Sequence, residues 1–257
     1  MRARAISSQL PVFPDAIRFS ESILDIESWC TILDMALRVK DDGAEVGYGT
    51  AARETRLPEP PTQARGAAKR ERIYRAAIAR YRSGGIEATR VEDVIADADV
   101  SWATFFRYFP RKEDVLIEAA ARHFREHVEP VAAHGIRDRR LRLRTVTERT
   151  LATLLRPTEL PQALHTEALL EVVAHPTRFA AMVDNGHPTP LIGLIAEILE
   201  EGQRRGEVRD DVDTAAAAVT VGAGTMFPAV QAAAAGADAT IGVRIALDIL
   251  WAGLTPG

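Results

Sequence analysis

Residues 84–116 read GGIEATRVEDVIADADVSWATFFRYFPRKEDVL, and this stretch decides the fold. A glycine pair at its start favours the end of a preceding helix, because glycine adopts the left-handed backbone of a helix C-terminus. Thr89, with Glu92 three residues later, has the spacing of a capping box and predicts a short helix that begins at Thr89. Segment 97–100 leaves room only for a tight connection to the next helix.

Helical signals continue on both sides of this stretch. Before it, apolar residues at i, i+3, i+4 and i+8 from Ile73 predict a helix that begins near Ala67. After the tight connection, Ser101 predicts an N-cap for a helix over 102–109, which Pro110 ends. A longer helix is expected to begin at Pro110. Two short helices joined by a tight turn form a helix-turn-helix motif.

The stretch resembles the DNA-binding domain of the TetR family of bacterial repressors, over about residues 68–125. The resemblance lies in the order of its parts: glycine pair, threonine, short valine and isoleucine helix, Val-Ser turn, Thr-Phe-Phe-x-Tyr-Phe cluster, and a lysine three residues past the last phenylalanine. It implies an all-α homodimer with an N-terminal three-helix DNA-binding domain and a larger C-terminal ligand-binding and dimerisation domain. The residues that it places at DNA are Thr89, Arg90, Ser101, Trp102, Ala103, Thr104, Phe106, Arg107, Tyr108 and Lys112.

The resemblance gives these residues separate roles. Thr89 and Arg90 are implied to lie near phosphate, at the start of the second helix. Thr104, Arg107 and Tyr108 are implied to face the major groove or its backbone. Arginine can pair with guanine O6 and N7 in a bidentate way, so Arg107 is the expected base-reading residue.

The stretch also departs from the family pattern. Asp99 stands where the family usually has glycine, and aspartate tolerates the left-handed backbone of the turn better than most residues. Trp102 and Ala103 stand where a small or polar residue and often glycine are found. Phe106 replaces a tyrosine whose hydroxyl often touches phosphate. We expect an unusual operator preference rather than a loss of DNA binding.

Charge is distributed unevenly along the chain. The chain has 32 Lys and Arg residues against 36 Asp and Glu, a formal net charge of −4. Residues 65–82 nevertheless hold 7 basic residues against Glu71 alone. This pattern predicts a helix that faces a polyanion, and a solvated arginine-rich helix face is the alternative. By the resemblance, Lys112 contacts phosphate as well.

Residues 1–64 are expected to be an N-terminal extension, with a helix over 20–40 and a proline-rich linker. A docking helix, a partner-binding arm and residues translated from an assumed upstream start are all consistent with it. Cys30 is the one cysteine of the chain, which excludes an intramolecular disulfide. The first residues do not have the pattern of a secretory signal, so we expect a cytoplasmic protein.

The rest of the chain fits the same architecture. Residues 65–125 are the expected helix-turn-helix domain with the start of a connecting helix, and residues 126–257 are the expected ligand-binding and dimerisation domain. Helical patterns cover 141–155, 160–174 and 190–205. Apolar side chains dominate these helices, so we expect a small, mainly apolar inducer. The predicted pocket residues are Leu151, Leu155, Leu164, Leu169, Val172, Phe179 and Met182, with His165 and Glu167 as candidate polar anchors.

Residues 214–237 carry no charged side chain across 24 positions, which is long enough to span a bilayer. The segment is rich in alanine and glycine, and Pro228 and Gln231 interrupt it, so we favour a buried helix over a membrane span. Together with a helix over 239–254, it is expected to form the dimer interface.

Signals of catalysis are weak, and we expect neither an enzyme nor a cofactor. The sequence has no G-x-S-x-G nucleophile elbow and no P-loop. His123 and His127 lie four residues apart on a helix, but no H-E-x-x-H pattern surrounds them, so a solvated pair is favoured over a metal site.

The sequence therefore predicts a ligand-responsive repressor that binds a palindromic double-stranded operator as a homodimer. The alternative is a helical ligand-binding or protein-interaction module that no longer reads a specific DNA sequence. Trp102 and Phe106 are the residues on which the two interpretations differ.

Overall fold

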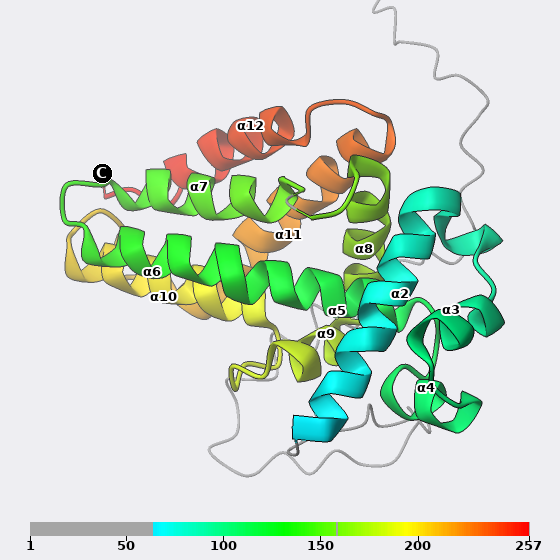
Figure 1. Ribbon diagram of the computed structural model, residues 1–257. Helices are drawn as coiled ribbons and strands as arrows, with labels where there is room; N and C mark the ends of the chain where they lie inside the picture. Colours follow the sequence, from blue (N-terminus) through cyan, green and yellow to red (C-terminus); the bar gives the residue numbers. More distant parts are fainter. Residues whose placement is uncertain (1–63, 158, 257) are drawn as a thin grey trace, which may run out of the picture.

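The computed structural model describes residues 64–157 and 159–256. Within these ranges every regular element is a helix, which confirms the predicted all-α class. Three helices form a unit at one end, and the remaining helices form a larger bundle beside it (Figure 1). The predicted helix over 20–40 and Cys30 lie outside the described residues.

The three-helix unit packs around the apolar stripe that the sequence predicts on its first helix. Ile73 and Tyr81 are buried in one core with Phe105. The hydroxyl of Tyr81 donates to the carbonyl of Lys112 at 2.7 Å and so joins the first helix to the segment after the third. The helices of the unit are α2 (Ala64–Ala88), α3 (Val91–Ala98) and α4 (Trp102–Tyr108).

The predicted capping box at Thr89 is wrong. α3 begins at Val91, and Arg90 occupies the N-cap position without a side-chain cap. The buried hydroxyl of Thr89 instead donates to the carbonyl of Gly85, 2.7 Å away. Gly85 has a φ of 78°, which breaks the path of the helix. The carbonyl of Gly85 therefore needs a partner other than a helical N–H, and Thr89 supplies it.

The turn between α3 and α4 forms as the sequence predicts. Asp99 adopts the left-handed conformation, with φ 48° and ψ 59°. The Oγ atom of Ser101 caps α4, since it accepts from the N–H of Thr104 at 3.2 Å. Arg80 of α2 braces this turn by donating to both carboxylate oxygens of Asp97, at 2.7 and 2.9 Å. The turn before α4 is thus held by α2 and by the cap at Ser101.

A helical rod leads from the three-helix unit into the bundle (Figure 1). Pro130 explains the π-helical turn in the rod, because it has no N–H for the carbonyl of Glu126, four residues earlier. The rod consists of α5 (Asp114–His123), the π-helical turn η1 (Phe124–Val128) and α6 (Glu129–Arg137).

The predicted start of this rod at Pro110 is wrong, because α5 begins at Asp114. The buried carboxylate of Asp114 accepts the N–H of Arg111 at 2.8 Å, which closes the turn before the helix. The other carboxylate oxygen accepts from Arg178 at 2.6 Å. The first residue of the rod is therefore held both by the segment after α4 and by Arg178, which lies in the short helix that begins at Pro176.

The helical patterns over 141–155, 160–174 and 190–205 are confirmed to within two residues at each end. The short helix that begins at Pro176 was not predicted as a separate element, although proline is well tolerated in a first helical turn. The remaining helices are α7 (Leu143–Leu155), α8 (Gln162–Ala174), α9 (Pro176–Val183), α10 (Pro190–Arg204), α11 (Thr214–Ala234) and α12 (Ala239–Ala252).

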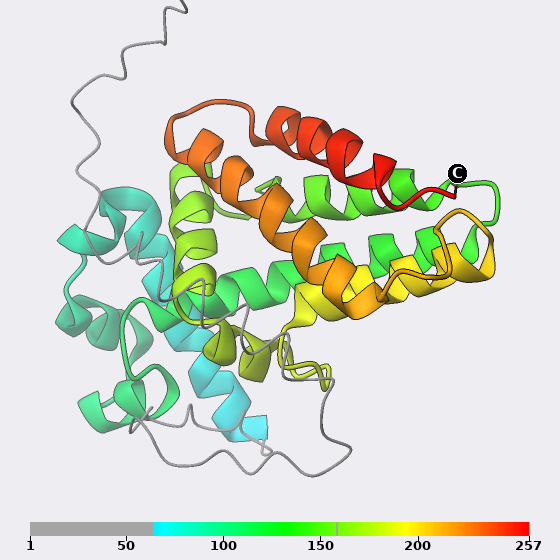
Figure 2. The ribbon, with the colours of Figure 1, turned by 180° about the vertical axis from the view of Figure 1, so that it is seen from behind.

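α11 is the uncharged helix of the sequence. Its residues Thr214–Ala233 are long and apolar enough to cross a membrane by length and composition alone. In the structure α11 packs along α10 and α12 (Figure 2). Pro228 lies inside the helix without ending it, and Asp213 caps its start by accepting from the N–H groups of Ala215 and Ala216.

Gly202 lies near the end of α10, where this helix packs tightly against the segment that leads to α11. A Cβ atom at this position would lie 2.5 Å from Cγ2 of Val208 and 3.5 Å from Cδ1 of Leu143. We expect Gly202→Ala to lower the free energy of unfolding by about 1–3 kcal/mol in urea titrations, as overpacking does. In the matched control Gly84→Ala, the new methyl would meet Ala88 at an ordinary 3.8 Å. A loss of similar size in both variants would contradict the tight contact.

Candidate functional site

The exposed face of α4 carries two aromatic rings. Trp102 and Phe106 are 49% and 41% exposed. Their rings stack with centroids 5.5 Å apart and an interplanar angle of 17°. The buried ring of Phe105 meets Phe106 edge-on, with centroids 5.2 Å apart. Because the core ring supports the outer pair, α4 presents an ordered apolar edge to solvent.

Polar groups surround this pair. Ser101, Ala103 and Arg107 are exposed and Thr104 is half-buried, with the two hydroxyl oxygens of Ser101 and Thr104 2.9 Å apart. The Arg107 guanidinium lies over the ring of Tyr108, 4.9 Å from its centroid, and donates to the Tyr108 hydroxyl at 3.1 Å. No carboxylate of the described chain pairs with Arg107. The α4 face therefore combines apolar rings with an uncompensated cation.

The other predicted DNA-contacting residues are less accessible. Thr89 is buried, and Arg90 is exposed but lies 3.5 Å from a carboxylate oxygen of Glu92. The ammonium group of Lys112 is half-buried and donates to the carbonyl of Ile86 at 2.9 Å. The structure thus exposes most of the predicted α4 residues and leaves Thr89 and Tyr108 buried in the fold, so the expectation that Tyr108 faces the major groove is wrong.

The arginine-rich α2 is not a uniformly free cationic face. Arg70 pairs with Glu118, Arg75 with Glu71, and Arg80 with Asp97. Arg70 is mostly buried in its pair, whereas the pairs of Arg75 and Arg80 lie at the exposed surface. The polyanion-facing role of α2 remains a prediction. The exposed side chains of Arg65 and Lys69, near the start of α2, remain candidates for phosphate contact.

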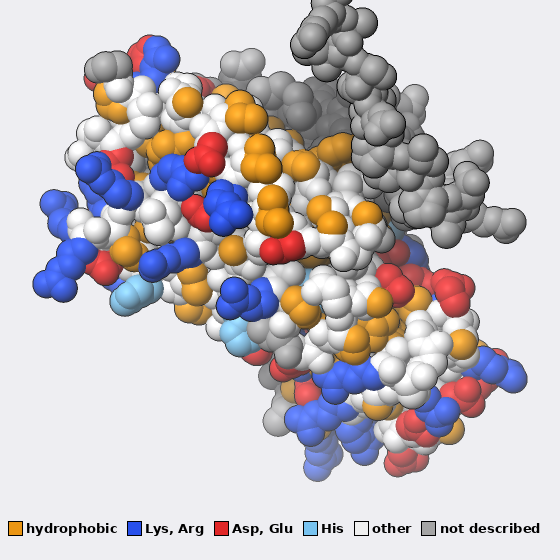
Figure 3. Space-filling view, turned by 90° about the horizontal axis from the view of Figure 1, so that it is seen from above, with side chains coloured by type: hydrophobic (Ala, Val, Ile, Leu, Met, Phe, Trp, Pro, Cys, Tyr) orange, Lys and Arg blue, Asp and Glu red, His pale blue; other side chains and the backbone are white. Residues whose placement is uncertain are grey.

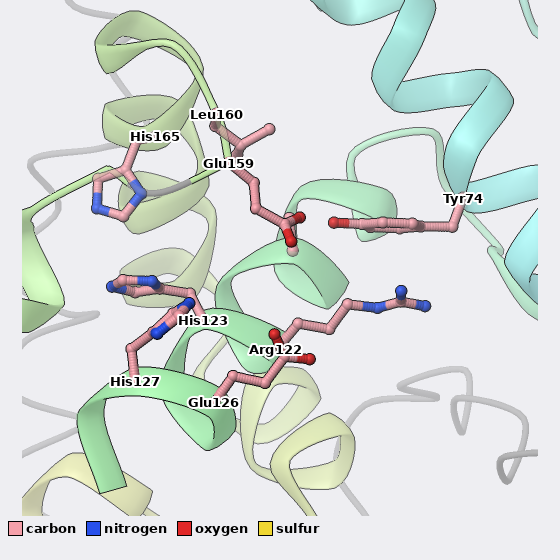
Figure 4. A pocket seen from close by; sticks show the side chains of 9 residues that line it. Tyr74, Arg122, His123, Glu126, His127, Glu159, Leu160 and His165 are labelled. Carbon is pink, nitrogen blue, oxygen red and sulfur yellow. The ribbon is translucent and has the colours of Figure 1, made fainter. Parts of the chain in front are cut away.

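A small polar hollow lies where α2, α5, η1 and α8 meet. Its volume is about 10 Å³, which is room for about one water. In Figure 4, His165 points toward His123 and His127, and Tyr74 and Arg122 lie on the opposite side of the hollow. Among the described residues, no group of three His, Cys, Asp or Glu side chains is placed to bind a metal ion.

Two of these histidines are buried. The Nε2 atoms of His123 and His165 lie 2.8 Å and 2.9 Å from the carbonyl oxygens of Thr153 and Leu154, at the end of α7. Burial lowers the pKa of both imidazoles below its ordinary value. Each is therefore neutral near pH 7 and donates an N–H to a carbonyl. The prediction of a solvated pair formed by His123 and His127 is wrong, because the fold covers His123.

Arg122 links the hollow to α2. Its guanidinium donates to Glu118 at 2.9 Å, pairs with Glu71 at 2.8 Å, and lies 3.8 Å from the ring centroid of Tyr74. The buried carboxylate of Glu118 also pairs with Arg70 of α2. The i, i+4 spacing of Glu118 and Arg122 is visible in the sequence, but their partners on α2 are not. A group that entered the hollow would touch the side chains that hold α2 against α5.

Of the predicted pocket residues, one, His165, borders the polar hollow. Glu167 is half-buried, and burial raises its pKa, with nearby Glu87 and Glu171 adding to the effect. The apolar residues of the set fill the core of the bundle or pack against it: Leu151, Leu155, Leu164, Leu169, Phe179, Val172 and Met182. Their assignment to a ligand site remains a prediction.

Comparison with known proteins finds a match to most of the three-helix unit and to the start of the rod. The sequence model described as "Bacterial regulatory proteins, tetR family" matches residues 73–119, which contain α3, α4 and the aromatic face. This segment of the chain is therefore similar to the DNA-binding region of TetR-family regulators.

Individual relatives are transcriptional repressors. The repressor KstR is 43% identical over 56 residues in Rhodococcus jostii and 41% identical over 56 residues in Mycobacterium tuberculosis. The match spans 22% of this chain and 26% of each relative, so the chain aligns with about a quarter of their length. Among solved structures, the TetR-family repressor FadR of Thermus thermophilus, in complex with lauroyl-CoA, is 26% identical with a TM-score of 0.60. That similarity covers 73% of this chain and 96% of FadR.

The buried histidines predict that stability depends on pH. In the unfolded chain a histidine has a pKa of about 6.5. Because the folded pKa values of His123 and His165 are lower, the unfolded state binds more protons between the folded and unfolded values. The free energy of unfolding should therefore fall as pH falls below about 6.5, by at most about 1.4 kcal/mol per pH unit for each histidine. Urea titrations at a series of pH values measure this slope.

The variant His165→Gln isolates the effect, because glutamine keeps an N–H donor but does not titrate. We expect a shallower slope in this variant. His134→Gln is the matched control, since His134 is exposed, and it should keep the slope of the unmodified chain. A slope that survives in His165→Gln would show that this histidine does not cause it.

Proposed function

We propose that the chain is a transcriptional repressor that binds double-stranded DNA through α4 as a homodimer and releases it when a small molecule binds. The observation that carries this proposal is the ordered aromatic and cationic face of α4, in a segment similar to the DNA-binding region of TetR-family regulators. The major groove of DNA, about 12 Å wide, admits an α-helix. On this proposal Arg107 reads guanine, and the rings of Trp102 and Phe106 contact thymine methyl groups. The function is non-enzymatic and belongs to the bacterial cytoplasm.

A second copy of the chain is the proposed partner of α12. Ile241, Ile245 and Ile249 are 46%, 56% and 71% exposed and recur every four residues, so they form one stripe. Seen from above, apolar side chains gather across this face of the bundle (Figure 3). A two-fold axis would bring the same stripe of two chains together and cover it.

The effector of the proposed repressor is a small, mainly apolar molecule. FadR of Thermus thermophilus, similar in fold, was solved with lauroyl-CoA, and the predicted pocket side chains of this chain are mostly apolar. In a dimer the two α4 helices must match DNA half-sites about 34–36 Å apart. An effector that favours another spacing weakens DNA binding, typically by 1–3 kcal/mol or about 5–150-fold.

A gel-shift titration with the DNA that flanks the gene tests the proposal. We expect a specific complex that competitor DNA of random sequence does not displace at equal concentration, and that weakens as salt rises. Binding that is equal for all sequences, or absent, would favour the alternative of a helical ligand-binding or interaction module.

The aromatic pair gives a sharper prediction about sequence preference. Replacing thymine by uracil in the bound site removes only the methyl group. At the contacted positions we expect wild-type binding to weaken about fourfold for each methyl, as the loss of one buried carbon predicts. Trp102→Ala should reduce this sensitivity to the thymines that Phe106 contacts, whereas Arg107→Ala should keep it and lose a guanine preference instead. Equal uracil sensitivity in wild type and Trp102→Ala would contradict the contact.

The α12 stripe gives a prediction about assembly. We expect Ile245→Glu to convert a dimer into a monomer in sedimentation velocity runs at micromolar concentration, because a buried unpaired carboxylate opposes association. Ala237→Glu adds the same side chain at an exposed position off the stripe and should leave the dimer intact. A wild-type monomer, or an Ile245→Glu dimer, would exclude this interface.

A further inference from the structure

A second, larger hollow runs along the outer face of the bundle, between the rod and α7. It is an open groove with a volume of about 650 Å³, within the range of about 300–1,000 Å³ that small-molecule sites occupy. Its floor is apolar and includes Val131 of α6, Leu141, and Val146 of α7. The groove does not contain the predicted pocket residues.

The polar side chains of the groove are mostly basic. The groove is lined by Arg149 of α7, by Arg156 directly after this helix, and by His127 and His134 of the rod. Glu126 is the acidic residue that lines it. Both arginine side chains are exposed, and within the described ranges no carboxylate pairs with either. By contrast, Arg144 on the same helix pairs with Glu148 and Asp248. The groove thus holds cationic charge that the protein itself leaves uncompensated.

The two arginines lie at different places along the groove. Arg149 follows Val146 by three residues on α7, so the two side chains lie on the same face of the helix. At Val146, Gly135 of the rod packs closely, since a Cβ on the glycine would be 2.6 Å from Cγ1 of the valine. Arg156 lies toward the polar hollow, because it follows Thr153, whose carbonyl binds His123. Arg149 is therefore the arginine next to the apolar floor.

We propose that this groove binds an amphiphilic organic anion, with its carboxylate or phosphate group at Arg149 and its apolar body along the floor formed by Val131, Leu141 and Val146. Charge-assisted hydrogen bonds from a guanidinium favour such an oxyanion, and the floor removes apolar surface from water. Figure 3 shows cationic and histidine side chains along the edge of the bundle, where solvent can reach them. This binding does not depend on the proposed repressor function.

The position of the groove connects it to the rest of the molecule. Glu126 and His127 of the π-helical turn line both the groove and the polar hollow that contains Arg122. π-helical turns inside α-helices occur frequently at functional sites. If the chain is the repressor proposed above, an occupant of the groove would act on the rod at its one irregular turn.

Calorimetric titration of the full chain, without DNA, tests the proposal with three probes that share one alkyl chain. They are dodecanoate, dodecyl phosphate and dodecanol, each kept below the concentration at which it aggregates. We expect saturable binding of one molecule of either anion and binding of the alcohol that is at least about tenfold weaker. The tighter of the two anions identifies the preferred acidic group. Equal affinity for all three probes would overturn the proposal.

Variants locate the site and separate it from the bulk charge of the protein. Arg149→Gln should weaken the anions about tenfold and leave dodecanol unchanged. Arg156→Gln should have a smaller effect, and Arg139→Gln, which removes an exposed arginine outside the groove, should have none. Ala152→Trp, which fills the groove, should block all three probes while circular dichroism shows an unchanged helix content. Equal losses in Arg149→Gln and Arg139→Gln would show that no defined site exists. Because the readout is binding alone, loss of DNA recognition does not affect it.

Discussion

The buried ion pair between Arg70 of α2 and Glu118 of α5 is the contact on which the position of the three-helix unit against the rod depends. Glu118 is 5% exposed and shares its other oxygen with Arg122, which also pairs with Glu71 of α2. Removing one partner of such a pair typically costs about 3–5 kcal/mol, because the other charge is left buried. The Nε atom of Arg70 is buried without a hydrogen-bond partner in the described structure, so the pair fixes geometry more than it maximises stability. It keeps α2, and through α2 the aromatic face of α4, in a set position relative to the rod.

Local signals in the sequence were sufficient for most of the three-helix unit. Ser101 as a cap and Asp99 in a left-handed turn depend on neighbours within a few residues, and the structure confirms both. The capping box at Thr89 failed because Gly85 breaks the helix and its carbonyl recruits the hydroxyl. The solvated interpretation of His123 failed for a different reason: helices distant in sequence cover it. Spacing along one helix does not reveal what packs against that helix.

The candidate sites likewise separate features that local sequence predicts from features that depend on packing between distant helices. A run of leucines at helical spacing predicts burial, but it does not distinguish a filled core from a cavity wall. Leu151 and Leu164 were predicted as pocket residues; both are buried in the core, and their contact with a ligand stays a prediction. The arginines of α2 were counted as one cationic face, whereas Arg70 and Arg80 pair with acids 48 and 17 residues away. The groove between the rod and α7 could not be foreseen either. Its charge pattern arises only when two helix faces come together.

Magnitudes constrain how an effector signal could pass through this structure. For the effector of the proposed repressor, a typical coupling free energy is about 1–3 kcal/mol, whereas removing one partner of a buried ion pair typically costs about 3–5 kcal/mol. We therefore expect the proposed effector to leave the contact between α2 and α5 closed. It would then move α2 and the first part of the rod together, as one body. The backbone must then bend beyond that body. The π-helical turn at Phe124–Val128 is a suitable place, because Pro130 leaves a backbone carbonyl there without its helical partner.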